Sequence, residues 1–566
     1  MKMNGARILL ECLKLEGVDT VFGYPGGTVI NLYDELFSFK EIRHILPRHE
    51  QAGVHAADGY ARASGKVGVA IATSGPGATN TVTGIATAYM DSIPLVVITG
   101  QVPTALIGND AFQEADIVGI TRPCTKHNFL VKDVRDLATI VKKAFYIARS
   151  GRPGPVLIDL PKDVQIAATE FKYPDTIELR GYKPTLEGHA RQIEKAVGML
   201  LAAKKPVIYV GGGAVLANAS NELSELAMKM DLPVTTTLMG LGSFPGNNPL
   251  ALGMLGMHGS YYANMAVSHS DLLVAVGARF DDRVTGKIAT FAPHAKIIHI
   301  DVDPTSIKKN VRVDLPIVGD VRGVLAKMLK VLEEQGDAID GFRRAIAPWL
   351  MEIDEWKQKH PMTFKHSTSV IKPQLVIQKL RELSDPDAIV ATDVGQNQMW
   401  TAQFFTFTMP RTFLSSGGLG TMGYGLPAAM GAQAAFPGRQ VIAVCGDGGF
   451  QMNMQEMASL VQHRLPVKIC ILNNNFLGMV RQWQELFFDK RYSQTCMELP
   501  IDFIKLAEAF GAKGFQATKP GEVESVIKKG FKTAGPVIME FKVAREEKVL
   551  PMVPAGASLT EMVLAS

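Results

Sequence analysis

The stretch Gln440-Val441-Ile442-Ala443-Val444-Cys445-Gly446-Asp447-Gly448 joins an apolar strand pattern directly to a Gly-Asp-Gly turn. A helical pattern follows from Asn453 to Leu465, and a second apolar strand, residues 466–472, leads into Asn473-Asn474, which begins 26 residues after Asp447. This order predicts two neighbouring parallel strands whose carboxyl ends meet at one edge of a sheet. The carboxylate and the amide therefore come together where α/β proteins bind ligands.

The residue types at this edge indicate which ligand is bound. The glycines let a phosphate approach the backbone, and the side-chain oxygens of Asp447 and Asn474 suit magnesium. A magnesium ion held by few protein groups completes its coordination with diphosphate oxygens and water. Turns favour the same residue types without any ligand, but the agreement of turn, spacing and strand context favours a magnesium–diphosphate site.

The composition is that of an ordinary globular protein: 566 residues, 47% hydrophobic, 20% charged, with a formal net charge of +4. The length predicts three or four domains, and the dispersed charge predicts binding to neither nucleic acid nor membranes. Five cysteines without a Cys-x-x-Cys pair favour a reducing compartment and argue against a thiolate metal site. No apolar run reaches the roughly 18 residues of a membrane span, and residues 6–10 begin a helical pattern rather than a signal peptide. We expect a cytoplasmic protein.

Strand patterns alternate with helical patterns along the whole chain, which predicts an α/β fold of three doubly wound parallel-sheet domains. Polar, proline-containing stretches at residues 169–184 and 360–373 are the predicted linkers. They give an N-terminal domain over 1–170, a central domain over 185–345, a C-terminal domain over 370–548 and a flexible tail over 549–566.

The first and third domains share a pattern. In the first, a strand at residues 67–72 leads into Ser74-Gly75-Pro76-Gly77, a helical segment and a strand at residues 93–98. From Gly75 to Pro94 is 19 positions, and from Gly446 to Pro466 is 20. We expect one fold used twice, although a chance match between two such units would look similar.

The central domain has glycine or aspartate after each of three predicted strands, residues 206–210, 271–276 and 296–300. Gly211, Gly212 and Gly213 follow the first strand, Gly277-Ala278-Arg279 the second, and Asp301-Val302-Asp303 the third. Such strand ends suit a nucleotide-sized ligand along the sheet edge, although glycine also serves plain turns.

Further motifs identify a family. They are residues 22–27 (Phe-Gly-Tyr-Pro-Gly-Gly), 48–51 (Arg-His-Glu-Gln), 73–80 (Thr-Ser-Gly-Pro-Gly-Ala-Thr-Asn), 111–114 (Ala-Phe-Gln-Glu), 150–155 (Ser-Gly-Arg-Pro-Gly-Pro), 256–259 (Gly-Met-His-Gly), 279–283 (Arg-Phe-Asp-Asp-Arg) and 478–483 (Gly-Met-Val-Arg-Gln-Trp). With the Gly-Asp-Gly and Asn-Asn pair, the chain resembles thiamine-diphosphate enzymes, and more closely the large catalytic subunits of the acetohydroxyacid synthase (acetolactate synthase) family, over essentially its whole length.

The resemblance implies the cofactors thiamine diphosphate, Mg²⁺ and FAD. It makes Glu50 the acid that hydrogen-bonds the cofactor's aminopyrimidine, and Met422 the apolar prop for its bent conformer. It makes Asp447, Asn474 and the carbonyl of Phe476 the metal ligands. The other implied thiamine-diphosphate contacts are Gly27, Gly395, Gln396, Asn397, Gly446, Gly448, Gly449 and Met479. Many relatives carry histidine at the position of Asn397 and serine at that of Gly449, which puts side-chain contacts to the diphosphate in doubt.

The family also implies substrate-contacting and flavin-binding residues. Phe112 and Gln113 would line the substrate channel, Arg283 would pair with the carboxylate of the second 2-oxo acid, and Trp483 with Met479 would form an apolar wall for its alkyl group. The implied FAD positions are Arg152, Gly211, Gly212, Gly213, Met257, His258, Gly277, Ala278, Arg279, Asp281, Asp301 and Asp320. The run 279–283 resembles the flavin-binding biosynthetic members, whereas fermentative acetolactate synthases lack it.

The resemblance implies decarboxylation of pyruvate and condensation with a second pyruvate or with 2-oxobutyrate, giving 2-acetolactate or 2-aceto-2-hydroxybutyrate. It also implies a homodimer or higher homo-oligomer and allows a small regulatory subunit. Three alternatives stay open: pyruvate oxidase chemistry, a nicotinamide enzyme suggested by the weak Gly-x-Gly-x-x-Gly match at residues 418–423, and an inactive scaffold.

Overall fold

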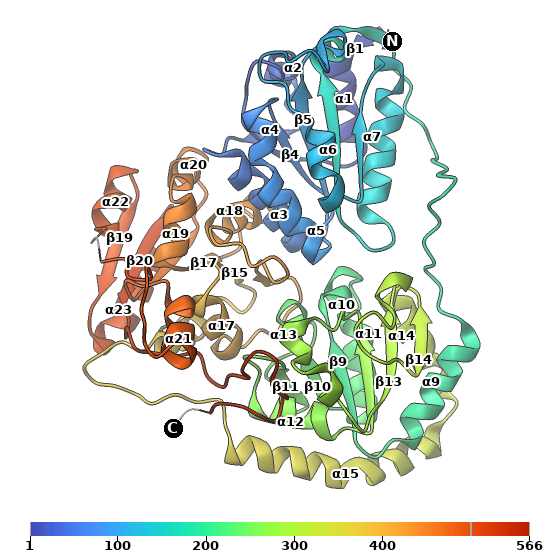
Figure 1. Cartoon of the computed structure of the whole chain (residues 1–566), viewed down its shortest axis with the longest axis vertical. Coiled ribbons are helices and arrows are strands. Elements are labelled where there is room, and N and C mark those ends of the chain that lie inside the picture. The colour runs from blue at the N-terminus through green and yellow to red at the C-terminus, as the bar shows by residue number, and fades with distance from the viewer. Residues whose placement is uncertain (1, 499–500, 565–566) are drawn as a thin grey trace. The chain divides into compact units, whose positions relative to one another are not determined.

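A computed structural model describes residues 2–498 and 501–564. The chain forms two compact units. Unit 1 comprises Met1–Lys183, Ser384–Asn397 and Leu414–Val543, and unit 2 comprises Pro184–Leu383, Gln398–Phe413 and Ala544–Ser566. Within the described residues, unit 1 contains two six-stranded sheets and unit 2 a third, so the predicted α/β fold with three parallel-sheet domains is confirmed (Figure 1).

The N-terminal sheet of unit 1 has the strand order β3-β2-β4-β5-β7-β6, with parallel neighbours. Its strands are β2 (Thr20–Gly23), β3 (Arg43–Ile45), β4 (Gly68–Ala72), β5 (Leu95–Gln101), β6 (His127–Leu130) and β7 (Pro155–Pro161). Its helices are α1 (Gly5–Leu15), α2 (Ile30–Ser38), α3 (Glu50–Ser64), α4 (Pro76–Asn80), α5 (Val82–Asp91), α6 (Ile117–Thr121), α7 (Val134–Arg149) and α8 (Lys162–Ile166). A short pair, β1 (Lys2–Asn4) with β8 (Ala168–Glu170), ties the two ends of this domain together.

The C-terminal sheet of unit 1 has the order β16-β15-β17-β18-β20-β19. Its strands are β15 (Ile389–Thr392), β16 (Phe413–Leu414), β17 (Val441–Gly446), β18 (Lys468–Asn473), β19 (Lys513–Ala517) and β20 (Val537–Lys542). The helices of this region are α18 (Gly425–Ala435), α19 (Asp447–Asn453), α20 (Glu456–Gln462), α21 (Gly478–Phe487), α22 (Phe503–Ala509) and α23 (Val523–Lys532). Helix α17 (Gln396–Phe404) begins in unit 1 and continues into unit 2. Its central strands β17 and β18 are buried on both faces, as their unbroken apolar runs require.

The two sheets of unit 1 share one topology. Numbered within each domain, both strand orders read 2-1-3-4-6-5, which confirms that one fold is used twice. In such sheets the strand order reverses between the first and third strands, and ligands bind at that switch point. The switch points lie between β2 and β4 and between β15 and β17.

Unit 2 has a different sheet order, β11-β10-β9-β12-β13-β14, or 3-2-1-4-5-6 within the domain. Its strands are β9 (Pro206–Val210), β10 (Val234–Thr236), β11 (Ala251–Met254), β12 (Leu272–Val276), β13 (Lys296–Asp301) and β14 (Leu315–Val318). Its helices are α9 (Ala190–Ala202), α10 (Gly212–Leu216), α11 (Ser220–Met230), α12 (Tyr261–His269), α13 (Asp282–Thr285), α14 (Val321–Glu333), α15 (Gly336–Lys359) and α16 (Pro373–Leu383). This order is the one found in dinucleotide-binding domains, with its switch point between β9 and β12.

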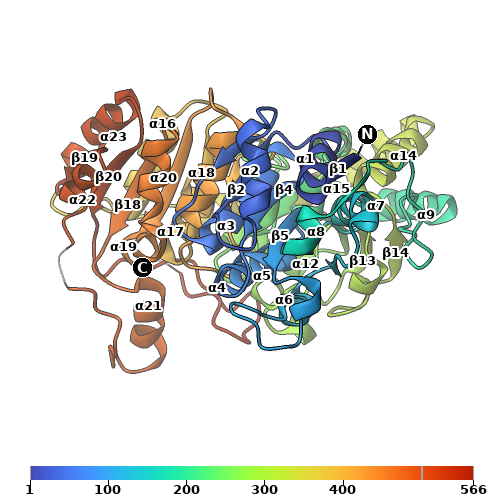
Figure 2. The ribbon, with the colours of Figure 1, turned by 90° about the horizontal axis from the view of Figure 1, so that it is seen from above.

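Helices α3 and α18 join the two domains of unit 1 and lie side by side in both ribbon views (Figures 1 and 2). Glycines allow this contact: a Cβ at Gly59 would lie 2.1 Å from the Ala428 carbonyl oxygen, and one at Gly431 only 1.8 Å from that of Ala56. Buried polar groups fix the crossing, because Asp58 accepts hydrogen bonds from Arg62 and from the Tyr424 hydroxyl. The helix that begins with Glu50 is thereby packed against the C-terminal domain of the same chain.

Two expectations about local structure are wrong. Gly446-Asp447-Gly448 is not a free turn, because α19 begins at Asp447 directly after β17. The helix expected from Asn453 to Leu465 is present as the shorter α20, which begins at Glu456. The segment after Lys548 is not a free tail, because Val553 and Leu559 are buried and the Val553 N–H donates to the Met257 carbonyl at 2.8 Å. The predicted domain limits remain proposals; residue 345 falls inside α15, while the predicted linker 169–184 contains the boundary between the units.

All five cysteines are free thiols, and Cys445 and Cys470 are buried in β17 and β18. Across residues 2–498 and 501–564, no helix is both long enough and apolar enough to span a membrane.

A buried acid in the N-terminal sheet gives a stability prediction. Asp159 on β7 accepts hydrogen bonds from Thr99 and Gln101, and burial raises its pKa from 3.8 to about 7. Because the folded pKa lies above the unfolded one, the contribution to stability is complete below pH 3.8 and is lost as pH rises to about 7. Asp159→Asn should abolish this loss, which is on the order of 4 kcal/mol.

Denaturant unfolding at pH 5 and pH 8 measures the effect. The wild type should lose more stability than Asp159→Asn over this interval. Equal losses in the two proteins would show that the carboxyl is not the source.

Candidate active site

The ends of β17 and β18 bring the predicted magnesium ligands together. In the parallel register Gly446 pairs with Leu472, so Asp447 and Asn474 follow neighbouring strands, and both are nearly buried. Burial raises the pKa of Asp447 to about 6, while the N–H of Asn474 opposes this rise. The Asn474 Oδ1 accepts a hydrogen bond from the Phe476 N–H at 3.0 Å, and this bond turns the chain so that Phe476 stays close to Asn474. A carboxylate, an amide oxygen and a carbonyl are hard donors that fit Mg²⁺.

Other metal arrangements have no support in the described residues. Across 2–498 and 501–564, no group of three or more His, Cys, Asp and Glu side chains gathers as a metal cluster. The predicted site is of a different kind, with one carboxylate whose fellow donors are an amide and a carbonyl.

The predicted diphosphate turn follows β15 at the same edge. Gly395 has a φ of +135°, a conformation that favours glycine, and Asn397 donates to the Val444 carbonyl at 2.9 Å. Gln396 lies beside the metal position, since its Oε1 accepts from Asn474 Nδ2 at 3.2 Å. Its Nε2 donates to Gln482 on α21 at 3.0 Å. The Asn397 side chain is therefore used to connect β15 with β17.

Glycines 448 and 449 leave space at the start of α19. A Cβ at Gly449 would lie 2.2 Å from a carboxylate oxygen of Asp393, so serine would not fit here without a shift. Asp393 is held in place, because it accepts from the N–H groups of Gly423 and Gly425. Those bonds fix the loop of Met422, whose Cε comes within 3.8 Å of a Cβ placed on Gly448. The departure at Gly449 thus has a steric reason in this chain.

The switch point of the N-terminal sheet brings together Glu50, the loop of Gly27 and the motif at residues 73–80. Glu50 begins α3, and its Oε2 accepts from Asn80 Nδ2 at 3.0 Å. A Cβ at Gly77 would lie 3.3 Å from Glu50 Oε1, so glycine keeps one face of the carboxyl open. Thr28, next to Gly27, bonds Thr73 through their hydroxyls at 3.0 Å.

Gln113 packs against the same motif. It has a φ of +59°, and a Cβ at Gly75 would lie 2.9 Å from its Cβ. Glu114 shapes this loop by accepting from the N–H groups of Gly108 and Ala111, which lower the pKa of the Glu114 carboxyl. Phe112 is 88% exposed at the tip. The structure therefore places Gln113 against Gly75 in the motif at residues 73–80, whereas Phe112 is exposed.

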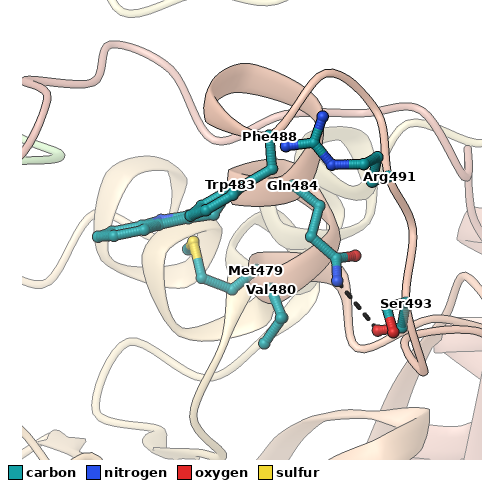
Figure 3. Close-up of a pocket in the computed structure, with 7 residues that line it drawn as sticks. All are labelled: Met479, Val480, Trp483, Gln484, Phe488, Arg491 and Ser493. Atoms are coloured by element: carbon teal, nitrogen blue, oxygen red, sulfur yellow. Dashed lines mark hydrogen bonds between the residues drawn. The ribbon is translucent and has the colours of Figure 1, made fainter.

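Helix α21 carries the predicted apolar wall beside an open pocket of about 680 Å³ (Figure 3). The pocket is lined by Met479, Val480, Trp483, Gln484, Phe488, Arg491 and Ser493. Met479 and Trp483, one helical turn apart, lie next to each other in Figure 3, and Gln484 donates to the Ser493 carbonyl at 3.0 Å. The pocket lining is mostly apolar, and Arg491 is its one cationic side chain. Such a lining suits a small anion that carries an alkyl group.

In unit 2 the predicted flavin positions gather along the carboxyl edge of the sheet. At the switch point, the Gly213 N–H donates to the Gly277 carbonyl at 3.0 Å, and a Cβ at Gly211 would lie 2.2 Å from that oxygen. Gly212 begins α10, and Ala278 lies within 2.9 Å of a Cβ on Gly211. Asp301 ends β13, and Asp320 follows β14.

Several of the predicted flavin-binding residues also interact with other residues of the protein. Asp281 and Asp320 cap α13 and α14 with their side chains, and Arg279 lies 3.8 Å from Asp281. Met257 donates its N–H to the Arg283 carbonyl at 2.7 Å. His258 is buried, which lowers its pKa to about 4, and its Nδ1 has no hydrogen-bond partner among the described residues.

Two predicted site residues belong to a different unit from the groups that they would serve. Arg283, on α13 with a 59% exposed side chain, belongs to unit 2, whereas Glu50, Trp483 and the metal ligands belong to unit 1. Arg152 belongs to unit 1, where it donates to Ser92 at 2.7 Å, whereas the remaining flavin positions belong to unit 2. Their roles stay predictions.

Asp393 and Asn80 were missed by sequence reasoning. Asp393 directly follows the strand at residues 389–392, at the same edge as Asp447, and this position was the available signal. Asn80 closes the motif at residues 73–80, but only the fold shows that it faces Glu50.

Comparisons with known proteins agree with this geometry. Three family models match: the thiamine pyrophosphate enzyme N-terminal TPP binding domain at residues 3–120, the central domain at 193–328 and the C-terminal TPP binding domain at 393–541. The chain is 49% identical to the acetolactate synthase large subunit of Haemophilus influenzae, over 100% of this chain and 98% of that protein. It is 49% identical to the acetolactate synthase isozyme 3 large subunit of Escherichia coli, over 100% and 99%.

The chain is also 48% identical to the probable acetolactate synthase large subunit of Methanococcus aeolicus, over 99% of this chain and 95% of that protein. The full-length similarity excludes a chance likeness of one domain. The chain belongs to the acetolactate synthase large-subunit family of thiamine pyrophosphate enzymes.

Proposed function

We propose that the protein is an acetolactate synthase, which condenses pyruvate with a second 2-oxo acid and releases CO₂. The products would be 2-acetolactate from two pyruvates and 2-aceto-2-hydroxybutyrate from pyruvate and 2-oxobutyrate. This is the first common step of branched-chain amino acid biosynthesis. The observation that carries the proposal is the joint arrangement of Asp447, Asn474 and Gln396 at one sheet edge in a chain of this family.

When bound, thiamine diphosphate would supply a carbon acid whose deprotonated form is nucleophilic toward the 2-oxo acid carbonyl, and a cationic ring that serves as the electron sink for the loss of CO₂. Asp447, Asn474 and the Phe476 carbonyl would hold Mg²⁺, and Gly395, Gly446 and Gly448 would leave the diphosphate access to backbone N–H groups. Glu50 would hold a proton against the aminopyrimidine, with Asn80 orienting the carboxyl at 3.0 Å. Trp483 and Met479 would exclude water from the acceptor's alkyl group.

The Mg²⁺ and FAD parts of the proposal rest on this chain's own residues. The donor set at Asp447 fits magnesium. For FAD, the 3-2-1-4-5-6 strand order, the glycine contact at its switch point and the unpartnered Nδ1 of buried His258 among the described residues support a dinucleotide. A homodimer or higher homo-oligomer, a small regulatory subunit and a cytoplasmic location also belong to the proposal. The large-subunit names of the relatives support a smaller partner.

Arg283→Ala should separate the two half-reactions. A guanidinium pairs well with a carboxylate, so its loss should lower condensation roughly 10- to 100-fold while CO₂ release in a single turnover is spared. Lys287→Ala, which removes a neighbouring exposed cation, is the control. Single-turnover product analysis distinguishes the steps, and a proportional loss of both would remove Arg283 from the acceptor site.

A product assay tests the function itself. Purified protein with pyruvate should form 2-acetolactate and CO₂ in a 1:1 ratio without consuming oxygen, and omission of thiamine diphosphate or magnesium should abolish both products. Oxygen uptake with acetyl phosphate formation would instead indicate pyruvate oxidase. Activity that required a nicotinamide cofactor would refute the proposal.

A further inference from the structure

The segment that leads into Glu50 is held by the other domain of unit 1. It connects the end of β3 at Ile45 to the first residue of α3. The Leu46 N–H donates to His463 Nε2 at 3.0 Å, and the Arg48 N–H donates to Glu456 Oε1 at 2.9 Å. These loop amides therefore take side-chain partners from the C-terminal domain, more than 400 residues away in sequence.

Glu456, Ser459 and His463, which we name the α20 clasp, form one connected set. The Ser459 hydroxyl lies 2.9 Å from both Glu456 Oε2 and the Leu46 carbonyl. His463 accepts through Nε2, and burial together with Arg43 and Arg48 lowers its pKa, which keeps the ring neutral. The clasp thus bonds Leu46 and Arg48 on the two sides of Pro47, two residues before Glu50.

Glu456 is an unusual residue for this position. It is fully buried on α20, and burial raises its pKa to about 7, although the Arg48 N–H opposes the rise. A buried carboxyl is costly unless its oxygens are bonded. Here both oxygens are used, because the Arg48 N–H also lies 3.2 Å from Oε2 and Ser459 donates to the same atom. The group is satisfied only while the 46–48 segment keeps its place.

Helix α19, which precedes α20 in the chain, begins with the candidate metal ligand Asp447. It ends at Asn453, and α20 begins at Glu456. Farther along α3, the close contact with α18 that Gly59 and Gly431 permit holds the helix against the same domain. The start of α3 is accordingly fixed from two directions by the domain that contains the metal ligands.

We propose that the α20 clasp positions Glu50 for its proton exchange with the cofactor, without touching the cofactor. Glu456, Ser459 and His463 are positioning residues for this reaction. The inference rests on the proposed function only for the role of Glu50, since the clasp itself is a property of the chain alone. Misplacing a reacting group by about 1 Å costs on the order of 100-fold in rate.

The first test uses the full-length protein without cofactor. Backbone hydrogen–deuterium exchange of peptides covering residues 44–50 should be roughly 10-fold faster or more in Glu456→Ala, because the Arg48 amide loses its acceptor. Peptides from α7 should be unchanged. Gln462→Ala, which removes an exposed contact to the Arg48 side chain outside the clasp, should leave residues 44–50 protected. Unchanged exchange in Glu456→Ala would overturn the proposal.

The second test follows Glu50 directly. Exchange of the C2 proton of bound thiamine diphosphate for deuterium, measured without substrate, should slow roughly 10- to 100-fold in Glu456→Ala. KM for pyruvate should stay within about 3-fold, since a loss confined to Glu50 leaves substrate contacts intact. Glu456→Gln, which keeps an acceptor for Arg48, should restore most of the rate.

Ser459→Ala is the variant of choice if Glu456→Ala does not fold, because it removes one donor without leaving a buried charge. It should slow C2 exchange in the same direction. Normal C2 exchange in a folded clasp variant would refute the positioning role while leaving the proposed function intact. If the wild type itself does not accelerate C2 exchange, the proposed function fails, and the cofactor-free exchange still tests the clasp.

Discussion

Glu50→Gln should lower turnover by roughly 100- to 10,000-fold while thiamine diphosphate still binds. Glutamine keeps the size of the side chain and can still accept from Asn80, which lies 3.0 Å from the carboxyl. It cannot hold and release a proton at the same place, so the loss should appear in kcat rather than in cofactor affinity. Initial rates of acetolactate formation and fluorescence titration with thiamine diphosphate measure the two quantities.

A matched change makes this result specific. Glu41→Gln alters an exposed carboxyl of the same domain that pairs with Lys14, and it should leave turnover unchanged. Turnover of Glu50→Gln within about 3-fold of the wild type would remove the catalytic role from Glu50.

Asp447→Asn should weaken thiamine diphosphate binding in magnesium by at least about 100-fold, since even outer partners of metal ligands contribute 10- to 100-fold. Asparagine keeps the shape but removes the charge that a divalent cation requires. The affinity that remains should no longer depend on magnesium. Calorimetric titration with and without magnesium measures this dependence.

The same variant also reports on folding. Burial raises the pKa of Asp447 to about 6, so the ionised group destabilises the cofactor-free fold at pH 8, and Asp447→Asn should unfold at no lower a temperature than the wild type. Asp489→Asn, an exposed carboxyl of the same domain, serves as the control. Wild-type cofactor affinity in a folded Asp447→Asn protein would contradict the assigned metal site.

Sequence alone predicted the regular parts of this fold because its signals are local. The strand at residues 206–210 matches β9 residue for residue, and the spacing of Gly75 and Gly446 from the next strands revealed the repeated domain. Unbroken apolar runs between glycine turns define buried parallel strands without knowledge of their partners.

The boundaries at the site were harder to predict. Helix α19 begins at Asp447, directly after β17, although two glycines with low helix propensity follow. The second of these glycines packs closely against the buried Asp393, a contact that the local sequence does not indicate. The segment after Lys548 shows no regular helical or strand pattern, so its sequence predicts no packed structure. Some of its side chains, among them Val553 and Leu559, are nevertheless buried.

Contacts distant in sequence left no local signal. Nothing near Glu456 indicates that it bonds the Arg48 amide, and nothing near Asn80 indicates that it faces Glu50. The roles that the family implies for Arg283 and Arg152 link residues of unit 1 with residues of unit 2, so no local sequence pattern predicts them.

The most direct test of the account locates the metal. Crystals grown with thiamine diphosphate and Mn²⁺ in place of Mg²⁺ should show an anomalous peak about 2.1 Å from oxygens of Asp447, Asn474 and Phe476, with diphosphate oxygens and water completing the octahedron. A bound cofactor whose metal lies away from these three oxygens would contradict the account.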